Sequence, residues 1–233
     1  MNDSLGRCAA AVFVKTPGRS PVKTRLAVAL GSERAERLHV AGADAVAAVL
    51  QALGPQLCAY YAVAEPGAAP AWPRLPCIAQ GDGGLGDRLH HVYAALQSRH
   101  GAALLLGADA PQVDAVAIAR AVAWLRDGIP RIAFGAALDG GFWLFGGNLP
   151  VERNLWTGIR YSAPDTGAAL LGALDGRAEL LRLPDLCDLD GAGDIAPVLA
   201  ALQALPSPLP EQQHMADLLH SALRAQATTG AVR

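Results

Sequence analysis

Four cations lie close together near the beginning of the chain and could bind phosphate groups. Residues 15–25 read KTPGRSPVKTR and contain no acidic residue, in a chain whose net charge is −2. The cations are Lys15, Arg19, Lys23 and Arg25. Lysine offers a point charge and arginine a two-pronged donor, while Gly18 lets the backbone approach a ligand closely. A diphosphate or triphosphate suits such a loop, although a solvated basic surface loop explains the same charges. The Walker A pattern is absent.

Three aspartates in two segments could hold a divalent metal ion. Asp109 closely follows residues 102–106 (AALLL), the clearest buried strand of the chain, where a side chain faces the ligand crevice of an α/β sheet. Asp188 and Asp190 flank Leu189, so both side chains project from one face of an extended segment. Carboxylate oxygens suit Mg²⁺ or Mn²⁺, with phosphate oxygens completing the ligand set. Turn and helix-cap roles explain the same aspartates without a metal.

A turn signal at residues 139–143 (DGGFW) carries groups that could act on a second substrate. Asp139 could accept a proton from an acceptor hydroxyl, and the two aromatic rings could stack on a flat or sugar ring. The acceptor-binding candidates are Gly140, Gly141, Phe142 and Trp143. The structural alternative is a tight turn between two strands.

Residues 81–86 (GDGGLG) match the G-x-G-x-x-G pattern of dinucleotide-binding loops. A lone match is weak evidence, and the strand predicted before it is short and ends in Gln80. We therefore expect Gly83 and Gly84 to pack close to a nucleotide base or sugar. An NAD-dependent dehydrogenase, with Asp109 on the ribose, is the alternative.

The composition describes a folded chain with no general affinity for nucleic acid. Of the 233 residues, 52% are hydrophobic and 17% charged, which excludes a disordered chain. The pI of about 6.3 leaves no basic field for nucleic acid. The four cysteines form no C-x-x-C pair, and the apolar residues 9–14 are too few for a signal peptide. We expect a cytoplasmic protein with free thiols and no membrane association.

Strands that alternate with helices predict the α/β fold that positions these side chains. The predicted strands cover residues 9–14, 57–63, 76–80, 102–106, 131–137, 142–145 and 179–183. The predicted helices cover residues 32–53, 87–98, 114–126, 164–174, 194–204 and 211–225. This order indicates a mostly parallel sheet sandwiched by helices, with an antiparallel hairpin around residues 131–146 at one edge. Ligands of such sheets bind beyond the carboxyl ends of the strands.

One domain is predicted to span residues 1–204. Residues 205–233 are expected to form a C-terminal helix and tail packed on the same domain. The apolar face of that helix is equally suited to pair with a second subunit in a homodimer.

Five segments resemble, in the same order, the motifs of one known family. They are residues 13–26 (FVKTPGRSPVKTRL), 80–89 (QGDGGLGDRL), 107–111 (GADAP), 139–146 (DGGFWLFG) and 188–190 (DLD). The family is that of small bacterial GT-A-type transferases, often labelled arsenosugar-biosynthesis-type glycosyltransferases. It is related to nucleotidyltransferases that make molybdenum-cofactor, phospholactate-guanylyl and sugar-nucleotide products. The chain departs from the pattern at residues 161–163 (YSA), where Trp-Ser-Thr is expected, and at residues 190–194 (DGAGD), where Asp-Thr-Pro-Glu-Asp is expected.

The resemblance implies a nucleotide-diphospho-sugar transferase fold that binds a nucleotide at residues 15–25. It also implies a metal ion held by Asp109 and an aspartate of the Asp188/Asp190 pair. Glycosyl transfer from a nucleotide sugar to a small-molecule acceptor is favoured, with catalytic roles for Lys23, Asp109 and Asp139. Nucleotidyl transfer, with attack at the α-phosphorus and release of pyrophosphate, fits the same residues. A non-catalytic nucleotide-binding protein is the alternative from another class.

Overall fold

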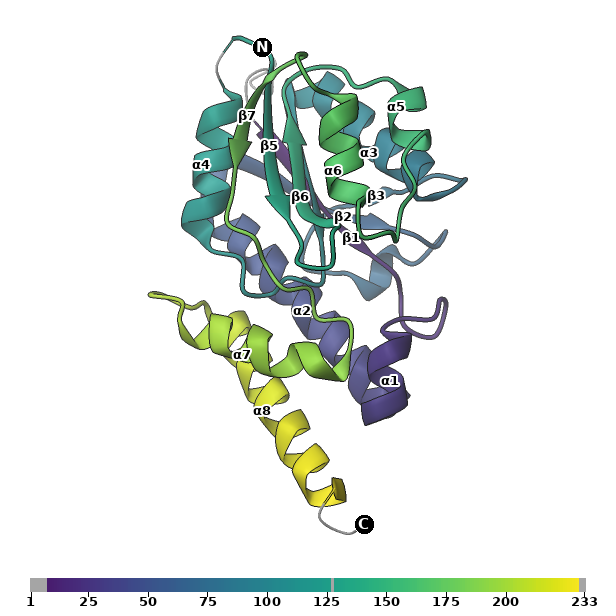
Figure 1. The fold of residues 1–233 in the computed structure, drawn as a ribbon, viewed down its shortest axis with the longest axis vertical. Helices are drawn as coiled ribbons and strands as arrows, with labels where there is room; N and C mark the ends of the chain where they lie inside the picture. The colour runs from purple at the N-terminus through teal and green to yellow at the C-terminus, as the bar shows by residue number, and fades with distance from the viewer. Residues whose placement is uncertain (1–7, 127, 231–233) are drawn as a thin grey trace.

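One sheet of seven strands forms the centre of the molecule (Figure 1). The structure is a computed structural model that describes residues 8–126 and 128–230. The strands are β1 (Cys8–Val14), β2 (Leu57–Val63), β3 (Cys77–Ala79), β4 (Ala102–Gly107), β5 (Arg131–Ala136), β6 (Phe142–Gly147) and β7 (Glu179–Arg182). Their spatial order is β3-β2-β1-β4-β6-β5-β7. Neighbouring strands are parallel except for β6, which is antiparallel to both β4 and β5. The predicted fold class is confirmed.

The predicted hairpin exists, but its expected place at the edge of the sheet is wrong. Strand β6 lies inside the sheet, where Phe145 pairs with Leu105 on one side and with Phe134 on the other. Strand β7 pairs with β5 and forms the edge instead. The alternation of hydrophobic residues predicts a hairpin but not the slot that it takes, because all strands from β4 to β6 are buried on both faces.

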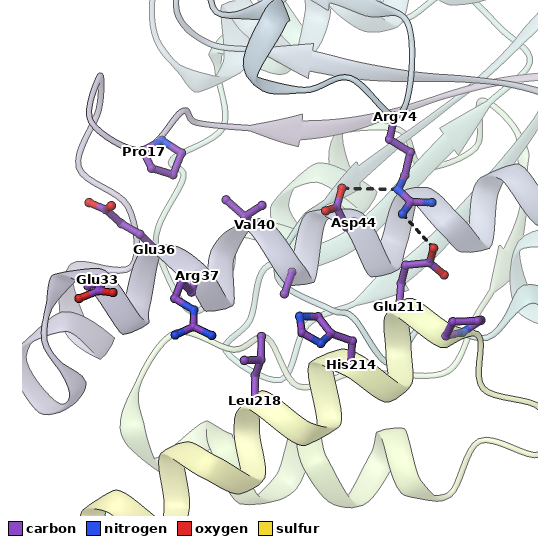
Figure 2. Close-up of a pocket in the computed structure, with 12 residues that line it drawn as sticks. Pro17, Glu33, Glu36, Arg37, Val40, Asp44, Arg74, Glu211, His214 and Leu218 are labelled. Atoms are coloured by element: carbon purple, nitrogen blue, oxygen red, sulfur yellow. Dashed lines mark ion pairs between the residues drawn. The ribbon is translucent and has the colours of Figure 1, made fainter.

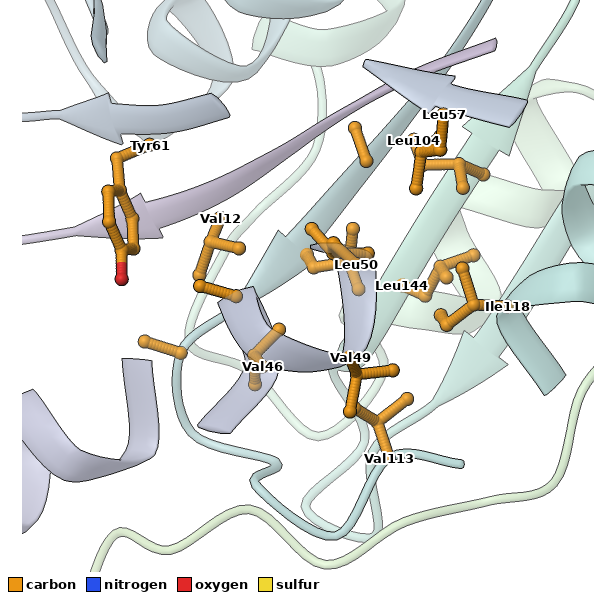
Figure 3. Close-up of a cluster of buried hydrophobic side chains, with 14 of the residues drawn as sticks. Val12, Val46, Val49, Leu50, Leu57, Tyr61, Leu104, Val113, Ile118 and Leu144 are labelled. Atoms are coloured by element: carbon orange, nitrogen blue, oxygen red, sulfur yellow. The ribbon is translucent and has the colours of Figure 1, made fainter. Parts of the chain in front are cut away.

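Alternate residues of β1 face two separate hydrophobic layers. Ala10 and Val12 point into a cluster with helices α2 (Ser32–Ala52) and α4 (Ala115–Leu125), part of which Figure 3 shows. Ala9 and Ala11 point to the opposite face. That face is covered by α3 (Leu85–His100), α5 (Arg153–Thr157) and α6 (Thr166–Ala173). This two-sided burial is why the strand reads as a continuous apolar run.

Three further helices lie at the end of the molecule where α2 begins, as Figure 1 shows. They are α1 (Thr24–Leu30), α7 (Ile195–Gln203) and α8 (Pro210–Gly230). Leu26 of α1, Leu38 of α2 and Leu199 of α7 bury their side chains together with Met215 and Leu219 of α8. The predictions missed α1 and α5, which are only seven and five residues long. No helix in the described part of the chain is long and apolar enough to cross a membrane.

Candidate functional site

The basic loop that follows β1 is held by the segment that connects β2 to β3. The amide of Thr16 donates to Glu65 Oε2 over 2.9 Å, and the indole of Trp72 donates to the Thr16 hydroxyl over 3.0 Å. The carbonyl oxygen of Lys15 lies 2.9 Å from His39 Nε2 on α2. Burial lowers the pKa of His39, which keeps the imidazole neutral so that Nε2–H donates to this carbonyl. These contacts anchor the loop to the β2–β3 segment and to α2.

A cavity of about 450 Å³ opens between this loop and the carboxyl ends of β1 and β4. Three of the four predicted cations, Lys15, Lys23 and Arg25, line it. The acidic lining residues are Asp109 and Asp190. A polyanionic ligand can thus contact cations on one wall while a carboxylate pair lies on another.

Lys23 lies at the centre of the charged groups. Its Nζ is 2.7 Å from Asp109 Oδ1 and 3.0 Å from Asp190 Oδ1, and only 5% of the side chain is exposed. Burial alone would lower the pKa of Lys23, but the two carboxylates outweigh it and the pKa is raised. Its backbone has φ 45° and ψ 44°, a left-handed conformation that is unfavourable for a residue with a Cβ. The chain accepts this cost at the residue that directly precedes α1.

The second acidic segment is tied to the first through the backbone. The amide of Leu189 donates to the carbonyl oxygen of Asp109 over 2.8 Å, and the side chain of Leu189 is buried. Asp188 and Asp190 on either side of it therefore lie near Asp109, Asp190 lining the larger cavity. Asp194 accepts from the amides of Asp190 and Gly191, so it shapes the turn.

Asp188 is the feature that fits a cation best. Its Oδ1 is buried without a hydrogen-bond partner. Burial, followed by the charges of Asp109, Asp139 and Asp190, raises the pKa of Asp188 to about 7. Within the described residues no three histidine, cysteine, aspartate or glutamate side chains already surround one point. Mg²⁺ and Mn²⁺ do not require that, because one or two carboxylates suffice when substrate phosphates supply the other oxygens.

A second cavity of about 290 Å³ adjoins the first, on the side of the sheet covered by α3 and α6. Four residues line both cavities: Phe13, Leu85, Asp109 and Ser162. Three of the residues predicted at the turn after β5, namely Asp139, Gly141 and Phe142, line only this smaller cavity. Asp139 Oδ1 accepts from the amide of Gly141 over 2.9 Å, which fixes the turn.

Trp143 does not fit the predicted acceptor-binding role. It is only 2% exposed, and its indole donates to the carbonyl oxygen of Pro184 over 3.0 Å. Because side chains alternate along β6, Phe142 and Trp143 point to opposite faces of the sheet, and Trp143 belongs to the core. Gly140 lies in the same turn with φ +92°, where its role is to reverse the chain.

Four predicted phosphate- or nucleotide-binding residues do not line the larger cavity. Arg19 donates from Nη1 to the carbonyl oxygen of Pro66 over 2.9 Å, which ties the loop to its neighbour, and Gly18 provides the turn with φ +76°. Gly83 and Gly84 are exposed, and the amide of Gly84 donates to the carboxylate of Asp87 at the start of α3. The glycine pattern also follows β3 at the edge of the sheet, whereas a dinucleotide fold carries it after a central strand.

Some residues that line the two cavities were not predicted as ligands. His39 and Gln80 line the larger cavity, and Gln80 donates to the carbonyl oxygens of Val14 and Ala62 at 3.1 and 2.8 Å. Tyr161 and Thr166 line the smaller cavity. The signals in the sequence for these positions were the polar Gln80 at the end of an apolar strand and the departure from the family pattern at residues 161–163.

A larger cavity, of about 620 Å³, lies elsewhere, between α2 and α8 (Figure 2). Arg74 forms ion pairs there with Asp44 at 3.6 Å and with Glu211 at 2.8 Å. Neither Lys23 nor any of the four aspartates of the site lines it. Size alone therefore does not identify the site, and the predicted charged residues gather around the two smaller cavities.

Comparisons with known proteins place the chain in a structural context. A family model described as "Uncharacterized protein conserved in bacteria (DUF2064)" matches residues 39–163, which is more than half of the chain. No curated protein matches the chain. A candidate nucleotide-diphospho-sugar transferase from Desulfovibrio desulfuricans G20 has a similar structure, with a TM-score of 0.77 at 23% identity. The similarity covers 92% of this chain and 97% of that one.

Two more distant structures share the fold. One is 4-diphosphocytidyl-2C-methyl-D-erythritol synthase from Anaerococcus prevotii DSM 20548, with a TM-score of 0.51 at 10% identity and coverage of 85% and 99%. The other is CMP:2-keto-3-deoxy-manno-octonic acid synthetase complexed with CTP, with a TM-score of 0.50 at 12% identity and coverage of 84% and 98%. At these identities the likenesses establish the fold, and the arsenosugar-type specificity stays a prediction.

Proposed function

The chain belongs to the DUF2064 family of bacterial proteins, and from its site we propose that it is a metal-dependent transferase that uses a nucleotide donor. Glycosyl transfer from a nucleotide sugar is the reaction that we favour. The names of the three structures with the same fold, a nucleotide-diphospho-sugar transferase and two cytidylyl-compound synthases, support a nucleotide donor.

The observation that carries the proposal is the junction of the two cavities at Asp109. The cavity lined by Lys15, Lys23 and Arg25 suits the phosphates of a donor, and the smaller cavity suits an acceptor. Asp109 lines both and also pairs with Lys23. A bond that is exchanged between donor and acceptor would have to lie at this junction.

Each charged residue then has a distinct task. Lys15, Lys23 and Arg25 bind and orient the phosphates and stabilise the negative charge of the leaving nucleoside diphosphate. Asp139 accepts the proton of the acceptor hydroxyl. Asp109 and Asp188 would hold Mg²⁺ or Mn²⁺, which would neutralise phosphate charge when bound. The unpartnered oxygen of Asp188 supports this assignment.

Nucleotidyl transfer is the second candidate. The two cytidylyl-compound synthases of the same fold favour it. In that reaction the acceptor attacks the α-phosphorus and pyrophosphate leaves, so the acceptor of a nucleotide-diphospho product must itself carry a phosphate. A non-catalytic nucleotide-binding protein would bind a nucleotide without turnover.

Thermal unfolding with a panel of nucleoside triphosphates, nucleotide sugars and NAD tests the proposal. Each ligand is measured with Mn²⁺ and with a chelator, on the wild type, on Asp109→Asn and on Asp175→Asn, whose exposed side chain lines neither cavity. A ligand at about 100 times its Kd stabilises the native state by about 2.7 kcal/mol. We expect one nucleotide to stabilise the wild type and Asp175→Asn when Mn²⁺ is present, and to lose this effect in Asp109→Asn.

Equal stabilisation of Asp109→Asn, or the same effect in chelator, would contradict the metal role of Asp109. The stabilising nucleotide is next incubated with the protein, and release of nucleoside diphosphate or of pyrophosphate separates the two reactions. Binding without either product would support the non-catalytic alternative.

A further inference from the structure

The smaller cavity has walls that restrict the chemistry of the acceptor. Much of its lining is apolar, including Phe13, Leu85, Leu89, Leu105 and Phe142. These residues come from β1, α3, β4 and β6, so a rigid framework rather than a loop shapes the wall. An occupant with an apolar face gains the free energy of burying that face here.

All charged residues that line this cavity are acidic. They are Asp109, Asp139 and Asp188, and no lysine, arginine or histidine of the described chain joins them. The nearest cation of the site, Lys23, lines the other cavity and is already shared by Asp109 and Asp190. The exposed Arg160, close in sequence to the lining residues 161–163, lies 3.7 Å from Asp165.

From this wall, and on the basis of the proposed function, we infer that the acceptor is a hydroxyl compound that has an apolar face and carries no phosphate or carboxylate. An anionic group in the cavity would lie among three acidic side chains, and no lysine, arginine or histidine of the described residues lines the cavity to bind it. A divalent cation does not reverse this balance, because the donor phosphates bring further negative charge to the same junction.

This substrate class favours glycosyl transfer over formation of a nucleotide-diphospho product. A hydroxyl oxygen of the acceptor forms the new bond to the anomeric carbon of the donor sugar. The bond from that carbon to the phosphate oxygen breaks, and its electron pair leaves with the nucleoside diphosphate. The hydroxyl proton passes to the carboxylate of Asp139. A nucleotide-diphospho product would instead need a phosphorylated acceptor, which this cavity disfavours.

Calorimetric titration with two matched probes tests the inference. Phenyl β-D-glucoside is neutral and has an apolar ring, and its 6-phosphate adds only the anionic group. Both are titrated into the full-length protein in chelator and in Mn²⁺, first without nucleotide and then with any nucleotide found to stabilise it. We expect the neutral probe to bind at least tenfold more tightly than its phosphate under each condition.

Two pairs of variants test whether the probe binds in the smaller cavity. Ala163→Lys adds a cation to the lining, and Ala168→Lys adds the same charge on an exposed position of α6 outside it. We expect Ala163→Lys alone to reduce the preference for the neutral probe. Phe142→Ala removes part of the apolar wall and should weaken the neutral probe severalfold, whereas Leu138→Ala, at a side chain that is 69% exposed, should not.

Equal or tighter binding of the phosphate by the wild type, in chelator or in Mn²⁺, would overturn the inference. Failure of both probes to bind would overturn it too, because an apolar face and free hydroxyls are all that it requires. Neither result bears on the nucleotide site, because that site is tested separately by thermal stabilisation with nucleotides. If the neutral probe binds more tightly than its phosphate but no nucleotide stabilises the protein, the proposed function is refuted. The inferred class of bound compound then still stands.

Discussion

The ammonium group of Lys23 separates two carboxylates that would otherwise repel each other. Lys23→Met keeps the length of the side chain and removes the charge. We expect a loss of about 1–2 kcal/mol in the free energy of unfolding at pH 7, because Asp109 and Asp190 lose a partner that is 5% exposed. Denaturant unfolding in chelator measures the change.

The raised pKa of Lys23 sets the pH range of this effect. A base whose pKa is higher in the folded state contributes its full stability below the unfolded pKa and loses it only as the pH rises through the folded pKa. The destabilisation by Lys23→Met should thus persist up to about pH 9, which is below the ordinary lysine pKa of about 10.4. Lys15→Met, at an exposed lysine, is the control and should change stability by less than about 0.5 kcal/mol.

Asp188 should make the protein less stable as the pH rises. Its pKa is about 7 in the folded state, against about 3.9 in an unfolded chain. Between these values the folded state holds a proton that the unfolded state has released, so the free energy of unfolding falls as the pH increases. Asp188→Asn should remove this loss and gain about 1–3 kcal/mol at pH 8, with little change at pH 4.

Unfolding in chelator at both pH values tests this, with the exposed Asp185→Asn as the matched control. A larger gain at pH 4 than at pH 8 would contradict the prediction. Mn²⁺ should reduce the gain at pH 8, because a bound cation stabilises the carboxylate of the wild type.

At the residue scale, the sequence predicted which charged side chains could act together, but not which of them form ion pairs. The alternation around Leu189 predicted Asp188 and Asp190 on one face, whereas Asp188 lines the smaller cavity and Asp190 the larger one. The pairing of Lys23 with two aspartates could not be predicted, since it depends on a left-handed backbone that no proline or glycine at that position announces. Trp143 was misread because an aromatic residue next to a turn looks the same whether it faces a ligand or the core.

At the scale of elements, the turn between β5 and β6 positions the acceptor side of the site. Gly140 has φ +92°, and a Cβ there would collide with the carbonyl oxygen of Pro164. The carbonyl oxygen of Gly140 also accepts from the amide of Gly167 over 2.9 Å. The turn that carries Asp139 is therefore packed directly on the segment before α6.

Gly140→Ala should separate these two segments. We expect a loss of about 1–3 kcal/mol in the free energy of unfolding, because strain and collision add. Binding of phenyl β-D-glucoside should be lost, while nucleotide stabilisation should persist. Gly172→Ala, in a helical position with open space, is the control and should gain up to about 1 kcal/mol. Equal effects of both substitutions would show that the turn does not need this contact.

The long elements were predictable and the short ones were not. Strand β2 and helix α2 lie within one residue of their predicted bounds, because each carries a clear period of hydrophobic residues between turn signals. Helices α1 and α5 are too short to show such a period. Because α1 was not predicted, the sequence did not show that the basic loop ends in a helix that begins at Thr24.

At the scale of the whole molecule, α8 stabilises the region that carries Asp109. Gln212 at the beginning of α8 is 2% exposed and donates to the carbonyl oxygens of Pro111 and Val113 at 2.9 and 3.0 Å. Met215 and Leu219 of the same helix are fully buried. The predicted packing of residues 205–233 on the main domain can be tested through these contacts.

A chain that ends at Ala204 should unfold at a lower temperature and respond less to nucleotide than the full chain. Loss of α8 exposes the apolar side chains that it covers and leaves two carbonyl groups without donors. Gln212→Ala should show a smaller decrease of about 1–3 kcal/mol, and Gln213→Ala, at an exposed position, almost none. A truncated chain as stable as the full one would show that α8 belongs to another interface, such as that of a homodimer.

The overall architecture followed from the order of elements, whereas the site at its centre required coordinates. Alternating strands and helices predicted the layers, and the carboxyl-end rule predicted a site at the edge where the two cavities lie. The two cavities at that edge share residues that are far apart in the sequence, from Phe13 to Ser162. Long-range packing of this kind leaves no periodic trace in a single sequence.

The wall that the two cavities share has a consequence for how this family can evolve. Phe13, Leu85, Asp109 and Ser162 each contact both spaces, so a mutation at any of them alters two specificities at once. Under the proposed function, a descendant that changes these positions would alter the donor side and the acceptor side together. Inherited variation in substrate choice should therefore accumulate at residues that only one cavity uses, such as Arg25 on one side and Ala163 on the other.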